Sequence, residues 1–218
     1  MNRDAILAWA EDRMAAADDG LRGTGFRYYH GLRVGALARA LAERMECGIE
    51  PDILEVAGVL HDLGKSGGES NEDHGPRGAA ILRREAGHLF SSPETLERVA
   101  LIVAQHYARP RSKWYDGKAR PLWPDEVLLV QDADLLDHCG GAEIRTICRR
   151  ELQKNLTPLE ALALIKLPSA TPDWRAEVRR ALNFEASRAE FDYRTQQANL
   201  FRAQFARELE GKLARPLL

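Results

Sequence analysis

Five prolines constrain this 218-residue chain more than any other feature, because each begins an apolar stretch with helical spacing. They are Pro51, Pro93, Pro124, Pro158 and Pro172. A proline at the first helical position loses nothing by lacking an N–H, since that group has no partner inside the helix. These positions therefore predict five helix starts.

Capping residues support three of these starts. Ser92 and Thr171 directly precede two of the prolines, where a hydroxyl can accept a hydrogen bond from the first helical turn. Thr157 and Glu160 have the S/T-x-x-E spacing of a capping box ahead of an apolar run. The local signals thus agree with the prolines.

The rest of the chain also has helical patterns. From Tyr28 to Glu46, leucines and a methionine recur every three to five residues, and Ile6 to Ala17 is expected to form a leading helix. No stretch alternates as strands do, so the predicted fold class is all-α. We expect residues 1–155 to form the catalytic domain. Residues 156–218 are expected to form a helical extension that packs on the core or forms a dimer face.

Composition excludes several classes of protein. The 31 basic and 33 acidic residues give a net charge of -2, which provides no overall attraction for a nucleic acid backbone. No run approaches the ~20 apolar residues of a membrane span, and no leader pattern opens the chain, so a cytoplasmic protein is expected. Cys47, Cys139 and Cys148 lack C-x-x-C spacing and predict neither disulfides nor a zinc knuckle.

Two polar loops stand out. Residues 64–73 are rich in glycine, and residues 108–123 form the one strongly basic stretch of the chain. The second loop follows His106 and includes Arg109 and Arg111. We interpret it as a lid that steers phosphate groups, against the alternative of a solvated surface segment.

Four of the six histidines stand where a set of metal ligands would need them. They are His30, His61, His74 and His106, and Asp62 and a late aspartate would complete the set. Divalent cations accept mixed imidazole and carboxylate ligands and lower the pKa of a water that they bind. The cluster therefore predicts a hydrolytic metal centre.

The adjacent pair His61 and Asp62 restricts the local geometry. Neighbouring side chains point about 100° apart on a helix, so both reach one ion only where the helix ends. Gly64 is expected to supply that end. Lys65 would then lie near the ion and offset charge on a phosphoryl oxygen, which favours a phosphate ester as substrate.

The run from Leu60 to Lys65, LHDLGK, resembles the HD superfamily of metal-dependent phosphohydrolases. A helix with His30 precedes this run, and an Ala133-Asp134-x-Leu segment follows it, as in that family. The resemblance covers roughly residues 28–148 and implies an HD-domain helical bundle with a long C-terminal helical extension.

The resemblance also implies a ligand set. His30, His61, Asp62 and Asp134 would hold one divalent ion, and His74 and His106 a second one that Asp62 bridges to the first. One or two ions of Mn, Fe, Mg, Co, Ni or Zn are therefore the expected cofactor. Asp132 is an alternative late ligand, but Asp134 is preferred because the acid of the family usually follows alanine.

The remaining roles follow from the same resemblance. Asp62 and Lys65 are expected to be catalytic, and Lys65, Arg33, Arg109 and Arg111 to bind substrate. His88 and His138 match no family position and are expected to be structural or exposed. The sequence His106-Tyr107 lacks the paired histidines of the cyclic-dinucleotide branch. The segment around His30 is close to the triphosphate-cleaving branch, which does not require the second-site histidines.

The predicted function is hydrolysis of a phosphate ester or anhydride of a nucleotide or small phosphorylated metabolite by metal-activated water. Two alternatives remain. HD-type proteins with two irons use dioxygen to cleave C–P or C–C bonds, and a non-catalytic domain would only bind a nucleotide for regulation. The expected partners are a small phosphorylated substrate and, through the extension, a second copy of the chain; no membrane is expected.

Overall fold

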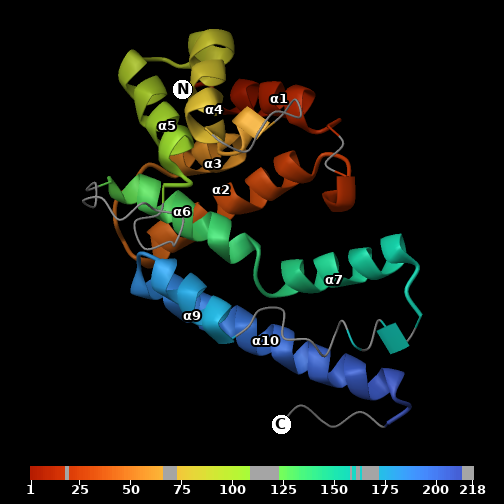
Figure 1. Ribbon diagram of the computed structural model, residues 1–218. Coiled ribbons are helices and arrows are strands. Elements are labelled where there is room, and N and C mark those ends of the chain that lie inside the picture. Colours follow the sequence, from red (N-terminus) through yellow and green to blue (C-terminus); the bar gives the residue numbers. More distant parts are fainter. Residues whose placement is uncertain are drawn as a thin grey trace.

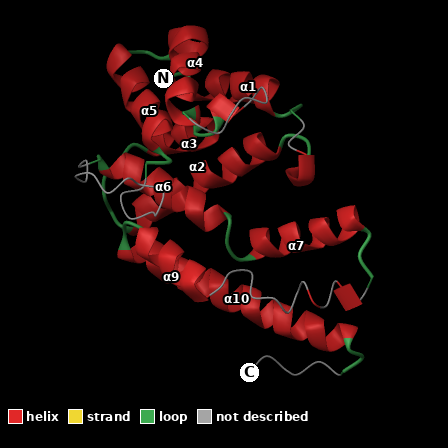
Figure 2. Ribbon diagram, in the orientation of Figure 1, coloured by secondary structure: helices red, strands yellow, loops and turns green. Residues whose placement is uncertain are grey.

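The computed structural model describes residues 1–17, 20–65, 73–108, 123–157, 159–160, 163 and 172–212. Within these ranges the chain consists of helices and loops and contains no β-strand (Figure 2). The all-α prediction is therefore confirmed. No helix in the described ranges is long and apolar enough to cross a membrane.

The helices form two groups along the chain. The first contains α1 (Arg3–Met14), η1 (Gly20–Arg22), α2 (Phe26–Arg44), α3 (Pro51–Leu60), η2 (Leu63–Lys65), α4 (His74–Ile81), the π-helical turn η3 (Leu82–Ala86), η4 (Gly87–Leu89), α5 (Pro93–Gln105) and α6 (Asp125–Asp137). The second contains α7 (Gly141–Lys154), α9 (Pro172–Ala181) and α10 (Glu185–Leu209). Figure 1 shows α1 to α5 clustered at one end and α7, α9 and α10 at the other, with α6 between them.

The predicted helix starts agree with the structure wherever it describes them. Helices α3, α5 and α9 begin at their prolines, whereas Pro124 is the N-cap of α6, which begins one residue later. The Ser92 hydroxyl accepts a hydrogen bond from the Thr95 N–H at 3.2 Å. Pro158 and Thr171 lie outside the described residues.

The capping box also has the predicted contacts. The Thr157 N–H donates to Glu160 Oε2 at 2.8 Å, and the Glu160 N–H donates to Thr157 Oγ1 at 3.4 Å. Each residue therefore satisfies a backbone donor of the other, as the S/T-x-x-E spacing predicts.

Two helix boundaries differ from the sequence-based expectation. The leading helix covers Arg3–Met14, three residues earlier than predicted at each end, because Asn2 Oδ1 accepts a hydrogen bond from the Ala5 N–H at 3.2 Å. Helix α2 begins at Phe26, directly after Gly25, which has a φ of 67°. A Cβ on Gly25 would lie 2.5 Å from the Ala15 carbonyl oxygen, so a glycine is needed at this start.

Glycines allow α2 and α3 to approach closely. A Cβ built on Gly31 would lie 2.5 Å from the Val59 carbonyl oxygen, and one on Gly35 would lie 2.6 Å from the Glu55 carbonyl oxygen. On the facing helix, a Cβ on Gly58 would collide with the backbone of Gly35. Only hydrogen atoms fit at these positions, and the close approach brings His30 on α2 beside the end of α3.

The hydrophobic core surrounds α3. Every residue of this helix from Val56 to Leu60 is buried, and Leu82, Ile102 and Leu129 of neighbouring elements are also fully buried. Burying a large aliphatic side chain contributes about 1.5 to 3 kcal/mol each. This packing holds the C-terminal end of α3, and therefore His61, in a rigid environment.

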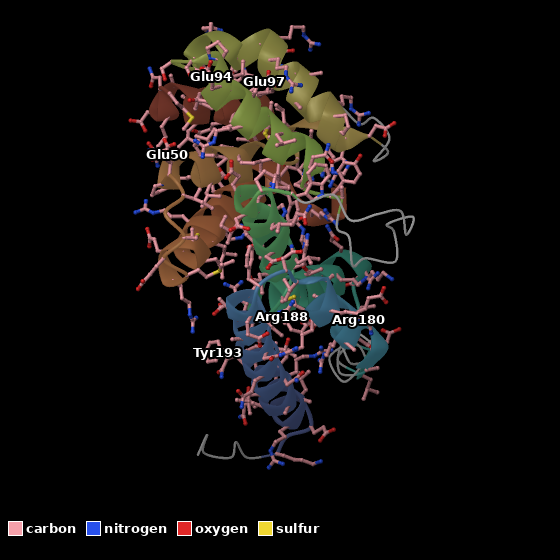
Figure 3. The ribbon with its side chains drawn as sticks, turned by 90° about the vertical axis from the view of Figure 1, so that its left-hand side faces the viewer. Glu50, Glu94, Glu97, Arg180, Arg188 and Tyr193 are labelled. Atoms are coloured by element: carbon pink, nitrogen blue, oxygen red, sulfur yellow. The ribbon has the colours of Figure 1, made fainter. Side chains whose placement is uncertain are left out.

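The C-terminal helices attach to the rest of the molecule through buried apolar residues, such as Leu182 and Phe191, and through polar contacts with α6. Asp132 accepts hydrogen bonds from the N–H groups of Asn183 and Phe184 at 2.9 and 3.1 Å. Arg194 donates to the Leu136 carbonyl oxygen at 3.1 Å. Figure 3 shows Arg180, Arg188 and Tyr193 in the lower half of the molecule, and Glu50, Glu94 and Glu97 in the upper half. The extension thus contacts the helix that carries Asp134, and the division at residue 155 stays a prediction.

Candidate metal centre

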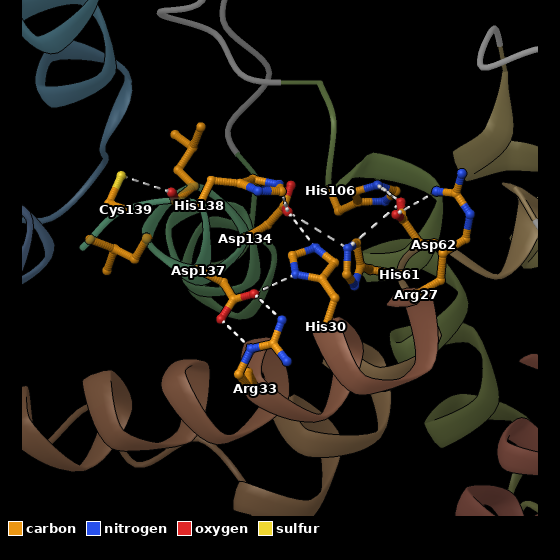
Figure 4. A network of polar contacts seen from close by, with 12 residues as sticks. Arg27, His30, Arg33, His61, Asp62, His106, Asp134, Asp137, His138 and Cys139 are labelled. Carbon is orange, nitrogen blue, oxygen red and sulfur yellow. Dashed lines mark hydrogen bonds and ion pairs between the residues drawn. The ribbon is translucent and has the colours of Figure 1, made fainter. Parts of the chain in front are cut away.

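The predicted ligands lie at or near helix ends, and Figure 4 shows five of them, all except His74, close together. His61 and His106 directly follow the last residues of α3 and α5, and His74 is the first residue of α4. His30 lies near the start of α2, and Asp134 lies in the last turn of α6. Side chains at helix ends can turn toward a common centre without disrupting helical hydrogen bonds.

Backbone carbonyls orient two of the histidine rings. His61 Nδ1 lies 2.6 Å from the Gly58 carbonyl oxygen, and His106 Nδ1 lies 2.8 Å from the Val103 carbonyl oxygen. A carbonyl oxygen can only accept, so each Nδ1 carries the proton and each Nε2 keeps its lone pair. This arrangement is typical of histidines that bind a metal through Nε2.

A carboxylate orients His30 in the same way. Its Nδ1 lies 2.6 Å from Asp137 Oδ2, and its Nε2 lies 3.1 Å from Asp134 Oδ1. Burial lowers the pKa of His30, but the hydrogen bonds and charges of the two aspartates outweigh it and raise the pKa to about 9. A carboxylate behind a ligand histidine fixes the ring and increases its basicity.

The donor atoms form two groups that share His61. One group is His30, His61 and Asp134, the other is His61, Asp62 and His106, and within each group the donor atoms lie within 4.8 Å of one another. His61 Nε2 is 3.7 Å from Asp134 Oδ1 and 3.6 Å from Asp62 Oδ1. Ligands of one metal ion lie about 3 to 3.5 Å apart when the bonds are about 2.1 Å long. The spacing therefore suits metal coordination after small shifts.

His74 completes the cluster. Its Nε2 lies 3.0 Å from His106 Nε2 and 3.8 Å from Asp62 Oδ1. The structure therefore brings together all six predicted ligands.

The chemistry of the cluster fits a divalent metal ion. His61 is buried, and its Nε2 has no hydrogen-bond partner among the described residues. Burial lowers the pKa of His61 to about 3, so the ring is neutral at physiological pH. A buried lone pair without a partner costs free energy, which a metal bond to Nε2 would remove.

Basic side chains surround Asp62. Lys65 Nζ lies 2.7 Å from Asp62 Oδ1, and Arg27 Nη1 donates to Asp62 Oδ2 at 3.3 Å. Burial alone would raise the pKa of Asp62, but its contacts with His61, His106 and Lys65 hold the pKa well below its usual range. Asp62 is therefore ionised and can act as a metal ligand.

Gly64 has a different role from the one expected. Helix α3 ends at Leu60, but Gly64 lacks the left-handed conformation of a C-terminal glycine and lies in the turn η2. A Cβ on Gly64 would collide with the His74 carbonyl oxygen and lie 2.7 Å from the Gly78 nitrogen. Gly64 is therefore needed for the close contact that positions His74 beside Asp62.

The structure distinguishes the two candidate late ligands. Asp134 lies among the histidines, whereas Asp132 is fully buried on another face of α6. Asp132 accepts hydrogen bonds from the backbone of Asn183 and Phe184. Burial raises the pKa of Asp132, although these hydrogen bonds oppose the increase. Asp132 therefore anchors the extension, and Asp134 faces the metal centre.

The predicted substrate-binding residues have different surroundings. Lys65 lies at the centre beside Asp62, as described above. Arg33 donates two hydrogen bonds to Asp137, at 2.8 and 2.9 Å, and so lies behind His30 (Figure 4). Arg109 and Arg111 lie outside the described residues. Their role in substrate binding stays a prediction.

Sequence reasoning missed three residues next to the centre. Asp137 supports His30, Arg27 contacts Asp62, and His138 Nε2 lies 3.6 Å from Asp134 Oδ1. His138 is exposed, as expected, and His88 is exposed as well. Helical spacing could have identified the three, because residues three or four apart share a helix face. Asp137 and His138 follow Asp134 at these spacings, and Arg27 precedes His30 by three residues.

The sequence model of the HD domain family matches residues 27–138, just over half of the chain and the segment that holds the six ligands. The chain belongs to the HD domain family. This finding confirms the resemblance noted from the LHDLGK run and from the order of the ligands.

Known structures share the fold over nearly the whole chain. An HD-superfamily hydrolase from Bacillus thuringiensis is 20% identical, with a TM-score of 0.63 over 96% of this chain and 97% of the other. YpgQ from Bacillus subtilis is 17% identical, with a TM-score of 0.61 over 97% of each chain. YpgQ in complex with ADP is 19% identical, with a TM-score of 0.58 over 96% of this chain and 94% of the other. At these identities the likeness concerns the fold alone.

One curated relative is similar in sequence. Ribonuclease Y from Desulfotalea psychrophila is 30% identical over 192 residues, which cover 86% of this chain and 32% of that protein. The chain thus spans about a third of the length of this relative.

Proposed function

We propose that this chain is a metal-dependent phosphohydrolase that cleaves a phosphate ester or anhydride of a nucleotide or small phosphorylated metabolite. One observation carries the proposal: six candidate ligand side chains, in or directly after five different helices, converge, and His61 belongs to both groups of donor atoms. Membership of the HD domain family supports the same reaction class.

The proposed ligand set is the one that the family resemblance implies, and the close approach of the six side chains supports it. His30, His61, Asp62 and Asp134 would hold one divalent ion, and His74 and His106, together with Asp62, a second. When bound, such an ion acts as a Lewis acid on a phosphoryl oxygen and lowers the pKa of a bound water. The mixture of imidazole and carboxylate donors suits Mn, Fe, Co, Ni or Zn better than Mg, which prefers oxygen ligands.

Residues of the chain supply the remaining chemistry. Asp62 is ionised and can orient the attacking water and accept its proton. Lys65 Nζ and the Arg27 guanidinium both contact Asp62, so they would lie beside a phosphate that binds at this centre. They would stabilise negative charge that develops on the phosphoryl oxygens and on the leaving group.

A nucleotide is the substrate class that we favour. YpgQ, which shares the fold, binds ADP in one of its structures, and the curated relative is a ribonuclease. The net charge of -2 makes a long polynucleotide a less suitable substrate than a mononucleotide, because a basic surface normally holds the polynucleotide backbone.

The test combines metal analysis with phosphate release from a nucleotide panel in Mn, Fe, Co, Ni, Zn and Mg. We expect about two ions per chain, and His61→Ala and Asp62→Ala should lower phosphate release about a thousandfold or more, since even changes behind a metal ligand cost about 10- to 100-fold. His88→Ala, which changes an exposed histidine of η4, is the matched control.

Two outcomes would contradict the proposal. Bound metal without turnover of any phosphate ester, with or without oxygen, would favour a binding module. Turnover that requires dioxygen would instead favour an oxygenase with two irons.

A further inference from the structure

A second pocket lies behind the metal centre, where the end of α6 meets α2, α7 and α10. It has a volume of about 400 Å³, and its lining includes Arg33, Asp137, Gly141, Arg145 and Arg194. None of the six predicted metal ligands lines it. Small-ligand sites have volumes of about 300 to 1,000 Å³, so this pocket can accept a small molecule.

The charge of the lining favours an anion. Three arginines face one carboxylate, Asp137, whose two oxygens already accept hydrogen bonds from Arg33 and His30. Arg194 donates to Glu190 and to the Leu136 carbonyl oxygen, so part of its charge is compensated. Arg33 is paired with Asp137 and Arg194 with Glu190, so one guanidinium charge, that of Arg145, remains uncompensated by the described residues. Guanidinium groups prefer phosphate oxygens.

Arg145 is the arginine that an incoming anion would recruit. It is exposed on α7 and has no ion pair or hydrogen bond with any described residue. The nearby acid Glu143 is already paired with Arg202 at 2.8 Å. The Arg145 guanidinium is therefore free to close over a ligand without breaking another contact.

Arg33 joins this pocket to the metal centre. It donates to Asp137 through Nε and Nη2, which leaves Nη1 for a ligand in the pocket. Asp137 Oδ2 in turn lies 2.6 Å from His30 Nδ1 (Figure 4). An anion that draws Arg33 toward the pocket would weaken its hold on Asp137 and so alter the support of His30.

We propose that this pocket is a second anion-binding site that takes the phosphate or pyrophosphate group of a small metabolite, with Arg145, Arg33 and Arg194 as its cationic side chains. The contacts from Arg33 through Asp137 to His30 link this site to the metal centre. The proposal does not depend on the catalytic activity of the chain.

The experiment is calorimetric titration of the metal-loaded full chain with imidodiphosphate, a pyrophosphate analogue that resists hydrolysis. We expect two binding sites in the unchanged protein. Arg145→Glu should weaken one of them at least tenfold, and Asp62→Ala should remove only the other. Arg150→Glu makes the same charge change on an exposed residue of α7 outside the pocket, and it should change neither affinity by more than about twofold.

A second variant, Gly141→Asp, tests the same site in case Arg145→Glu does not fold. A Cβ on Gly141 meets no atom within 4 Å, and an acidic residue at the first helical position is favourable, so Gly141→Asp should fold. Its carboxylate should weaken the same site as Arg145→Glu. Binding that Arg145→Glu and Gly141→Asp leave unchanged, or equal losses in the Arg145 and Arg150 variants, would overturn the proposal.

Discussion

Different interactions hold the two ends of the molecule together. Around the metal centre, α2, α3 and α4 meet through glycines that let backbones touch, and the residues between them are apolar and buried. At the other end, α7 has no buried residue, and ion pairs such as that between Arg202 and Glu143 join it to α10. The comparison indicates that close backbone packing fixes the ligands, whereas side-chain contacts attach the extension, both polar pairs and buried apolar residues such as Leu182 and Phe191.

Helix α6 belongs to both ends. Residues 132 and 134 of a helix point about 200° apart, so their side chains lie on nearly opposite faces. Asp134 faces the histidines, and Asp132 accepts hydrogen bonds from Asn183 and Phe184. One helix thus contacts the candidate metal centre on one side and the C-terminal extension on the other.

Replacing these two aspartates one at a time should have the largest effects on phosphate release and on stability. We expect Asp134→Ala to lower phosphate release and metal content, with activity reduced about a thousandfold or more, because changes behind a ligand already cost about 10- to 100-fold. Asp132→Ala should keep its metal but lose about 3 kcal/mol of unfolding free energy, since the N–H groups of Asn183 and Phe184 lose their acceptor.

Metal analysis and urea unfolding of the metal-free protein would measure both effects. Loss of metal from Asp132→Ala, or a fully active Asp134→Ala, would show that the two faces of α6 do not have separate roles.

Replacing a glycine at a close backbone contact should have the next largest effect on stability. In Gly64→Ala, the new methyl group would collide with the His74 carbonyl oxygen, and overpacking of this kind costs about 1 to 3 kcal/mol. We also expect weaker metal binding, because His74 must shift. Gly141→Ala is the control. Its Cβ meets no atom within 4 Å, so the free energy of unfolding in urea should change by less than about 0.5 kcal/mol. Equal stability of the two variants would contradict the role of close backbone packing.

Removing an ion pair that holds the extension should have the smallest effect on stability. Arg202→Met removes the contact with Glu143 and should cost about 1 to 2 kcal/mol of unfolding free energy while phosphate release stays unchanged. Arg39→Met is the control, because the Arg39 and Glu43 side chains are 50% and 57% exposed and an ion pair between exposed groups adds little stability.

Cys139 can report local opening at this attachment. Burial raises the pKa of Cys139 to about 12, so at pH 8 the thiol is protonated and shielded. It should react with a disulfide reagent more slowly than Cys47 and Cys148, and several-fold faster in Arg202→Met than in the unchanged protein. Equal rates in the two proteins would mean that the ion pair does not hold α7 and α10 together.

Local signals predicted much of the fold and of the ligand set. Prolines at 51, 93 and 172 begin helices, and the Ser92 cap forms as expected. These signals act within one turn of a helix, so a sequence displays them directly. The LHDLGK run and the spacing of the histidines similarly identified side chains that the structure brings together.

Side-chain surroundings were harder to predict. The sequence did not indicate that Arg33 donates to Asp137 behind His30, and Gly64 is required for a backbone contact rather than for ending a helix. Each of these contacts involves a residue in another element of the chain, and the three- to four-residue spacing of a helix does not predict such a partner. The role of Arg33 in substrate binding stays a prediction. His138 was assigned no role, although it lies next to Asp134.

The sequence by itself determined the helices, the family and the six residues that can bind metal, because proline positions, caps and the motif are local properties. Only the tertiary structure decided which aspartate of α6 faces the histidines, which residues support them, and where a pocket of arginines forms behind them. The physical reason is that these outcomes depend on how whole helices are rotated against one another. That rotation is set by packing at contacts such as Gly31 with Val59 and Gly64 with His74, whose partners are distant in sequence.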